Sequence, residues 1–333
     1  MTLFPAAANS MRIAVLDDFQ NVARDMADWS RLPAGNDVTF FHDHLADPGA
    51  LRERLTEFQI VVAMRERTPF PAALIDALPK LKLLITTGMR NASFDLDAAA
   101  RAGVLVCGTD GVGSPPAELT WGLILALARH IPGEHAGMRA GRWQTTVGTM
   151  LEGKTLGLLG LGRLGAIAAR VGAAFGMELI AWSQNLTAEK AQESGATLVE
   201  QDELFARSDF LCIHLVLSER TRGLVGAREL GLMKPAAYLV NISRGPIVDE
   251  AALVSALKKK QIAGAGLDVF DVEPLPAKHA LRRLDNVVLT PHLGYVTAEG
   301  YRKQYAGALE DILAFLDGKP VRALNAPRSI GER

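Results

Sequence analysis

Residues 160–165 read Gly160-Leu161-Gly162-Arg163-Leu164-Gly165, a glycine-rich turn between a strand-like and a helix-like stretch. The apolar run 155–159 precedes the turn, and a helical pattern over residues 166–175 follows it. In such a turn the first glycine permits a tight bend, the second lets a pyrophosphate approach the backbone, and the third permits close helix packing. Amides at the start of the helix then bind the anion. The turn therefore predicts a dinucleotide site, with cofactor contacts at Gly160, Gly162, Arg163, Leu164 and Gly165.

The composition is that of an ordinary globular protein with room for two domains, since 49% of the 333 residues are hydrophobic and 22% are charged. Lysine and arginine total 36 against 37 acidic residues, and a net charge of -1 gives no reason to expect nucleic acid or a membrane as partner. Cys107 and Cys212 lie in apolar runs and offer neither a disulfide framework nor a metal site, as expected of a cytoplasmic protein. We therefore expect a small-molecule partner.

Two further observations bear on membranes and export. The apolar stretch within residues 119–127 is too short to span a bilayer. Residues 1–10 lack the basic start and long apolar centre of a signal peptide. No membrane association is expected.

Short aliphatic runs alternate with helix-like stretches along the chain, which predicts parallel sheets covered by helices. The runs before the glycine-rich turn lie at residues 12–16, 60–64, 83–86 and 104–107. Those from the turn onward lie at residues 155–159, 178–182, 210–215, 237–242, 264–269 and 287–289. The second set has the six strands that a dinucleotide domain uses.

A boundary is expected near Gly113, because Ser114 and Pro115 are typical of the N-cap and first position of a long helix. An amphipathic pattern over residues 298–316 predicts a final helix that returns to the first domain. We predict an α/β protein with two doubly wound parallel-sheet domains and a ligand cleft between them. We expect a Rossmann-type dinucleotide-binding domain, residues 113–295, inserted into a discontinuous flavodoxin-like domain, residues 1–112 and 296–333.

Polar residues just after the later strands are the candidates for chemistry, because ligands bind at the carboxyl ends of strands in such sheets. Arg244 follows one strand in a sharp turn, and its guanidinium suits a carboxylate bidentately. Glu273 and His292 follow the next two strands. Taken singly, each has an ordinary alternative: a solvated loop arginine, a turn-forming acid and a structural histidine. His42 and His44 have no further ligands at suitable spacing, so no metal site is expected.

These segments, in this order, resemble the D-isomer-specific 2-hydroxyacid dehydrogenase family over nearly the whole chain, residues 12–327. The resemblance rests on the glycine-rich turn and on residues 241–250, 266–274 and 286–294. It implies a nicotinamide-dependent reductase of small 2-oxo acids to D-2-hydroxy acids, usually a homodimer formed through the inserted domain. It also implies roles for three residues: acid-base catalysis for His292, pairing with that histidine for Glu273, and binding of the substrate carboxylate and polarising of the 2-oxo group for Arg244.

Those residue types suit the reaction. Hydride delivered to a keto carbon leaves an alkoxide that an acid must protonate, and histidine titrates in the useful range. A carboxylate partner favours the protonated histidine.

The same resemblance extends to the ligand contacts. The segment 86–91, TTGMRN, matches the substrate loop, and its predicted contacts are Gly88, Met89 and Arg90. Arg90 stands where a small or acidic residue is usual, and Arg65 and Arg67 either join it to recognise a second acidic group or are solvated. Asp268 matches a contact to the nicotinamide amide. The other predicted cofactor contacts are Ser183, Leu215, Ile242, Ser243, His292 and Gly294.

The choice between NAD and NADP stays open at Ser183. An acid about 20 residues past the glycine-rich turn normally binds the ribose 2′-hydroxyl of NAD, and Ser183 takes its place here. Without that acid nothing repels the 2′-phosphate of NADP, yet no arginine follows at Gln184 or Asn185 to bind one. A slight preference for NAD is predicted, with NADP not excluded.

The alternative from another class is a dinucleotide-sensing regulator, since transcriptional corepressors resemble this family and keep the same three residues. The near-neutral charge weighs against it, and absence of turnover on a broad panel of 2-oxo acids would favour it. Formate dehydrogenases pair the histidine with glutamine, so Glu273 argues against that branch.

Overall fold

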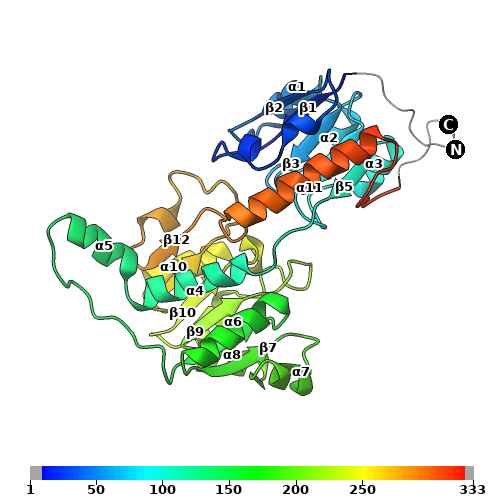
Figure 1. Ribbon diagram of the computed structural model, residues 1–333. Helices are drawn as coiled ribbons and strands as arrows, with labels where there is room; N and C mark the ends of the chain where they lie inside the picture. The colour runs from blue at the N-terminus through cyan, green and yellow to red at the C-terminus, as the bar shows by residue number, and fades with distance from the viewer. Residues whose placement is uncertain (1–9, 327–333) are drawn as a thin grey trace. The chain divides into compact units, whose positions relative to one another are not determined.

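The computed structural model describes residues 10–326, which form two compact units (Figure 1). The first unit contains the chain up to Val112 and again from Thr297, and the second is Gly113–Val296. Residues 1–9, most of the stretch in which no signal peptide is expected, lie outside the described range, as do residues 327–333. Within residues 10–326, no helix is long and apolar enough to cross a membrane.

The first unit is built on a five-stranded parallel sheet in the order β2-β1-β3-β4-β5, which is the flavodoxin-like order. Its elements are β1 (Arg12–Val15), η1 (Ala23–Asp25), η2 (Trp29–Arg31), β2 (Asp37–Phe40), α1 (Pro48–Leu55), β3 (Ile60–Ala63), α2 (Ala72–Asp76), β4 (Leu83–Thr86), α3 (Leu96–Arg101), β5 (Leu105–Gly108) and α11 (Ala298–Leu316). Apolar side chains of α1, α2 and α3 pack with those of the strands in one core. Helix α11 contacts β4 and lies along this sheet in Figure 1. It buries Tyr301, Tyr305, Leu309 and Ile312, as its apolar period predicts.

The second unit is built on a seven-stranded parallel sheet in the order β12-β11-β10-β9-β6-β7-β8. Its elements are α4 (Pro115–Ala128), α5 (Ile131–Arg139), β6 (Thr155–Leu159), α6 (Arg163–Ala174), β7 (Glu178–Trp182), α7 (Ala188–Glu193), β8 (Thr197–Leu198), α8 (Gln201–Arg207), β9 (Phe210–Ile213), α9 (Ala227–Leu232), β10 (Tyr238–Asn241), η3 (Gly245–Ile247), α10 (Glu250–Lys258), β11 (Gly264–Leu267), η4 (Ala280–Arg283) and β12 (Val287–Leu289). Helices α4 and α6 lie together on one face of the sheet (Figure 1), and α8, α9 and α10 cover the other. Strand β10 contributes Val240 to one core and Leu239 to the other, because successive side chains point to opposite faces.

The predicted fold class, two doubly wound parallel-sheet domains, is confirmed, but the predicted number of strands is too low in both sheets. Strand β2 lies at a sheet edge with partly exposed side chains, and β8 has only two residues. Neither contains the continuous apolar run that is typical of a buried strand, so the sequence pattern does not predict them. Helix α4 begins at Pro115 with Ser114 as N-cap, as predicted, although the serine side chain makes no capping hydrogen bond.

The strand order of the second unit reverses at β6, whose neighbours are β7 on one side and β9 on the other. Ligands bind beyond the carboxyl ends of the strands at such a switch point. Gly160 follows β6 there, and Leu215 lies just beyond β9. This edge of the sheet is the place to look for a site.

Candidate active site

The glycine-rich turn has the backbone geometry that a dinucleotide requires. Gly160 has a φ of +100°, and a Cβ there would come within 2.9 Å of the His214 carbonyl carbon. A Cβ on Gly165 would collide with the carbonyl oxygen of Gly160. By contrast, a Cβ on Gly162 would meet no atom within 4 Å, so the space in front of that backbone is open.

Gly162 is the N-cap of α6, and no described side chain caps this end of the helix. The first-turn amides, which include those of Arg163 and Leu164, therefore face the open space. A helix start with open amides is suited to a pyrophosphate. The residues present fit a dinucleotide.

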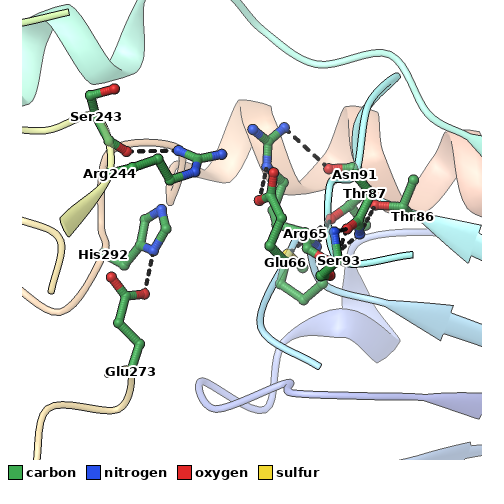
Figure 2. Close-up of polar contacts among 11 residues, drawn as sticks. Arg65, Glu66, Thr86, Thr87, Asn91, Ser93, Ser243, Arg244, Glu273 and His292 are labelled. Carbon is green, nitrogen blue, oxygen red and sulfur yellow. Dashed lines mark hydrogen bonds and ion pairs between the residues drawn. The ribbon is translucent and has the colours of Figure 1, made fainter. Parts of the chain in front are cut away.

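His292 and Glu273 form a close side-chain pair at the carboxyl ends of β11 and β12. The Nδ1 atom of His292 lies 2.6 Å from Oε2 of Glu273, and Oε1 of Glu273 accepts a hydrogen bond from the Phe270 amide at 2.9 Å. Figure 2 shows this pair together. Since Nδ1 is engaged by the carboxylate, Nε2 is the nitrogen left for a ligand. Both side chains keep some exposure, 18% for the histidine and 29% for the glutamate.

Asp268 organises the loop that carries the histidine. Its carboxylate is buried and accepts hydrogen bonds from the Thr290 hydroxyl at 2.6 Å, the Leu293 amide at 2.7 Å and the Gly294 amide at 2.9 Å. Burial raises the pKa of Asp268, and these three hydrogen bonds oppose that rise. His292 itself has a φ of +53°, a strained value for a residue with a side chain, so the loop must be held from outside. The Asp268 hydrogen bonds provide that restraint.

The loop after β10 fixes Arg244. The Asn241 side chain donates from Nδ2 to the Arg244 carbonyl at 3.0 Å and accepts from the Ser243 amide at 3.0 Å. The Arg244 Nη1 atom donates to the Ser243 carbonyl at 2.7 Å. A Cβ on Gly245 would collide with the backbone of Phe270, so this loop and the loop after β11 are closely packed. Strands β10, β11 and β12 are neighbours, and Figure 2 shows Arg244 and the His292–Glu273 pair at this edge of the sheet.

The other predicted cofactor residues lie at the same edge of the sheet. Leu215 follows β9, and its carbonyl accepts a hydrogen bond from the Ser243 hydroxyl. Ile242 follows β10 and is buried. Ser183 follows β7, at the opposite side of the switch point from His292.

The predicted substrate loop belongs to the first unit. Gly88 has a φ of +143°, and a Cβ there would come within 2.5 Å of the Arg65 guanidinium. Arg65 also donates from its amide to the Thr87 hydroxyl at 3.0 Å and from Nη1 to the Thr87 carbonyl at 3.3 Å, as Figure 2 shows. Met89 and Arg90 follow on the exposed part of the loop. Arg65 therefore lies at this loop.

Arg67 has a different place in the first unit. Its Nη1 atom donates to the Asp17 carbonyl at 3.1 Å, and its guanidinium lies 4.9 Å from the Phe19 ring centre. His44 is paired with Asp17 through an Nδ1–Oδ1 distance of 2.8 Å. Among residues 10–326, no group of three or more His, Cys, Asp or Glu side chains is placed to hold a metal ion.

Sequence reasoning misses two supporting residues of the site. Thr290 and Asn241 carry no charge and no motif of their own, yet they hold the Asp268 carboxylate and the Arg244 loop. Their only signal is position, since each lies at or just beyond the end of a strand, beside a predicted site residue.

Comparisons with known proteins agree on one family. Residues 121–294 match the family model described as D-isomer specific 2-hydroxyacid dehydrogenase, NAD binding domain. Glyoxylate reductase from Aeropyrum pernix is 41% identical over 256 residues, which cover 74% of this chain and 76% of that protein. D-3-phosphoglycerate dehydrogenase from Synechocystis sp. is 38% identical over 270 residues, 80% of this chain. The chain spans only 49% of that protein, about half its length.

Solved structures give the same result. The crystal structure of phosphoglycerate oxidoreductase from Vibrio cholerae superposes with a TM-score of 0.88 at 39% identity. The match covers 92% of this chain and 99% of that one.

Proposed function

Because the chain belongs to the D-isomer-specific 2-hydroxyacid dehydrogenase family, we propose that it reduces a small 2-oxo acid to the D-2-hydroxy acid with a nicotinamide dinucleotide. The observation that carries this proposal is the His292–Glu273 pair beyond a dinucleotide-binding turn. A bound nicotinamide would supply hydride to carbon 2 of the oxo acid. The protein must then supply a proton, hold the substrate and exclude other orientations of the substrate.

The first two of these tasks have residues on this chain. His292 donates the proton from Nε2 to the 2-oxygen as charge develops there, and Glu273 holds Nδ1 and favours the protonated ring. Arg244 binds the substrate carboxylate through its fork and polarises the 2-oxo group. Asp268 holds the loop of His292. The Gly88–Arg90 contacts to the substrate carboxylate stay a prediction.

The direct test is a steady-state screen of glyoxylate, hydroxypyruvate, pyruvate, phenylpyruvate and dicarboxylic 2-oxo acids with NADH and NADPH. We expect turnover of at least one acid with a D-configured product. No turnover with any acid, in a folded protein that binds dinucleotide, would contradict an enzymatic role and favour a regulator.

The pH profile tests the pair itself. Reduction requires protonated His292, so Glu273→Gln, which removes the charge and nearly keeps the shape, moves the alkaline limb of kcat/KM to lower pH. In the oxidising direction, which needs neutral His292, the acidic limb moves the same way. Profiles that overlay those of the wild type would show that the two residues are uncoupled.

We also propose a homodimer formed through the second unit. Helix α5 and residues 140–150 expose large apolar side chains, among them Trp143 at 73%, Val147 at 92% and Met150 at 68%. The Glu134 carboxylate accepts hydrogen bonds from both Thr145 and Thr146, so this stretch is held in shape while its apolar side chains are exposed. Several large apolar side chains exposed on one segment are typical of an interface.

Sedimentation velocity tests the dimer. The wild type should sediment as a dimer, and the double variant Trp143→Asp, Met150→Asp as a monomer with unchanged circular dichroism. A monomeric wild type would contradict the proposed homodimer.

We also propose a cytoplasmic location, which the two buried thiols favour.

A further inference from the structure

A pocket of about 700 Å³ opens at the carboxyl ends of β7 and β9, on the ribose side of the glycine-rich turn. Its lining comes from the loop after β7, the loop after β9 and the start of α8. The lining residues that matter below are Ser183, Gln184, Asn185, Ser218, Arg220 and Thr221. This pocket contains the position where the family's NAD-binding acid is expected, now occupied by Ser183.

The lining carries one charged side chain, Arg220, and no carboxylate. The other polar groups are hydroxyls and amides, which can donate hydrogen bonds to an anion. A second pocket of the same unit, about 680 Å³, differs, because three carboxylates, Asp249, Glu250 and Asp271, line it together with Arg222 and His279. The positive character of the first pocket is therefore a local property of these two loops.

Arg220 is held at the loop of Ser183 by a cross-loop hydrogen bond. Its Nη1 atom donates to Oε1 of Gln184 at 3.1 Å, and Gln184 is the neighbour of Ser183 in the chain. The turn that carries Arg220 is fixed by Thr221, whose hydroxyl accepts from the Ser218 amide at 2.8 Å and donates to the Val216 carbonyl at 2.7 Å. A guanidinium has five N–H donors, so one bond to Gln184 leaves others for a ligand.

We propose that Ser183, Gln184 and Arg220 form a subsite for the 2′-phosphate of the dinucleotide, so that NADP(H) is preferred to NAD(H). The inference rests on the proposed function and departs from the slight NAD preference predicted from the sequence. A 2′-phosphate carries a charge of about −2 at neutral pH and three acceptor oxygens, which match one guanidinium fork and neighbouring hydroxyl and amide donors. NAD offers only a neutral 2′-hydroxyl at this point, and no carboxylate lines the pocket to bind it.

Calorimetric binding separates this inference from catalysis. The titrants are NADPH, NADH, and the fragment pair adenosine 2′,5′-bisphosphate and 5′-AMP, which differ only in the 2′-phosphate. We expect the wild-type protein to bind NADPH about tenfold to hundredfold more tightly than NADH, and the bisphosphate more tightly than 5′-AMP by the same factor. This factor corresponds to the free energy of a hydrogen bond to a charged group. Added salt should weaken the binding of NADPH more than the binding of NADH.

Arg220→Met is the decisive variant, because it removes the charge and keeps much of the length. It should lose most of the NADPH advantage and change NADH affinity by less than about twofold. Arg170→Met, which removes an exposed arginine of α6 outside the pocket, is the matched control and should change neither affinity.

The outcomes distinguish this inference from the proposed function. Equal or tighter NADH binding by the wild type would overturn the 2′-phosphate subsite, and so would an Arg220→Met variant that weakens both dinucleotides equally. Dinucleotide binding with the expected preference but no turnover of any 2-oxo acid would overturn the proposed function and leave the subsite in place. Failure of both dinucleotides to bind would overturn both.

Discussion

The two ends of the same sheet edge are built in different ways. At the β11–β12 end, His292, Glu273 and Asp268 are joined by hydrogen bonds and partly or fully buried. At the β7–β9 end, Arg220 and Gln184 are exposed, and one hydrogen bond links them. Proton transfer requires a fixed geometry, whereas recognition of a phosphate tolerates mobile donors. The difference implies that substitutions at the first end affect rate and stability, and those at the second affect cofactor choice.

The largest expected effect is that of His292→Ala. Loss of a general acid-base residue costs about 10²- to 10⁴-fold in kcat. His279→Ala is a matched control, because His279 also pairs with a glutamate, Glu250, through an Nε2–Oε1 distance of 3.0 Å. Similar losses in both variants would show that the effect of His292→Ala is structural.

Arg244→Lys should have the next largest effect. Lysine keeps the charge but loses the planar fork, so kcat/KM for the oxo acid falls by about tenfold to hundredfold while dinucleotide affinity is unchanged. Steady-state kinetics and calorimetry measure the two quantities, and Arg222→Lys, in the acid-lined pocket, is the control. Kinetics near those of the wild type would show that Arg244 does not bind the substrate carboxylate.

Asp268→Asn tests the buried carboxylate through stability. Burial raises the pKa of Asp268 in the folded protein, so the folded state holds a proton that the unfolded state releases. The wild-type free energy of unfolding, relative to that of Asp268→Asn, should therefore fall as pH rises from the ordinary aspartate value, about 3.9, through the raised one. Urea unfolding of the cofactor-free protein across this range measures the difference.

Asp202→Asn is a control in which the difference in free energy of unfolding should change with pH in the opposite direction. A hydrogen bond from Arg228 lowers the pKa of Asp202, so its contribution to stability is lost as pH falls through that lowered value. A pH-independent difference for Asp268→Asn would show that its carboxylate ionises as freely in the folded state as in the unfolded one.

The arrangement at the β11–β12 end, which we propose to be catalytic, was largely predictable from the sequence, and that at the β7–β9 end, the proposed recognition end, was not. Arg244, Glu273 and His292 each follow a strand of recognisable apolar character, and parallel strands bring their carboxyl ends to one edge. Arg220 comes from a loop 36 residues beyond Gln184 in the chain, and only the pairing of β6 with both β7 and β9 brings the two loops together. A search for an arginine next to Ser183 in the sequence therefore fails.

The backbone conformation of His292 was equally hidden. Its φ of +53° depends on hydrogen bonds that Asp268 makes to later residues of the loop. No local pattern encodes that arrangement. Strands β2 and β8 were missed for a related reason, because edge strands depend on their partner more than on their own apolar residues.

Ser183→Asp should have the smallest effect and tests the recognition end alone. A carboxylate at this position repels a 2′-phosphate, offers Arg220 an intramolecular partner and can accept a hydrogen bond from the ribose 2′-hydroxyl of NAD. The ratio of kcat/KM for NADPH to that for NADH should fall by about threefold to tenfold, because Ser183 is only half-buried and solvent screens the charge. Gln192→Glu, which adds the same charge on α7 outside the pocket, should leave the ratio unchanged. A higher ratio in Ser183→Asp would show that the ribose 2′ position of the cofactor lies elsewhere. The β7–β9 end of the sheet would then not be the site of cofactor recognition.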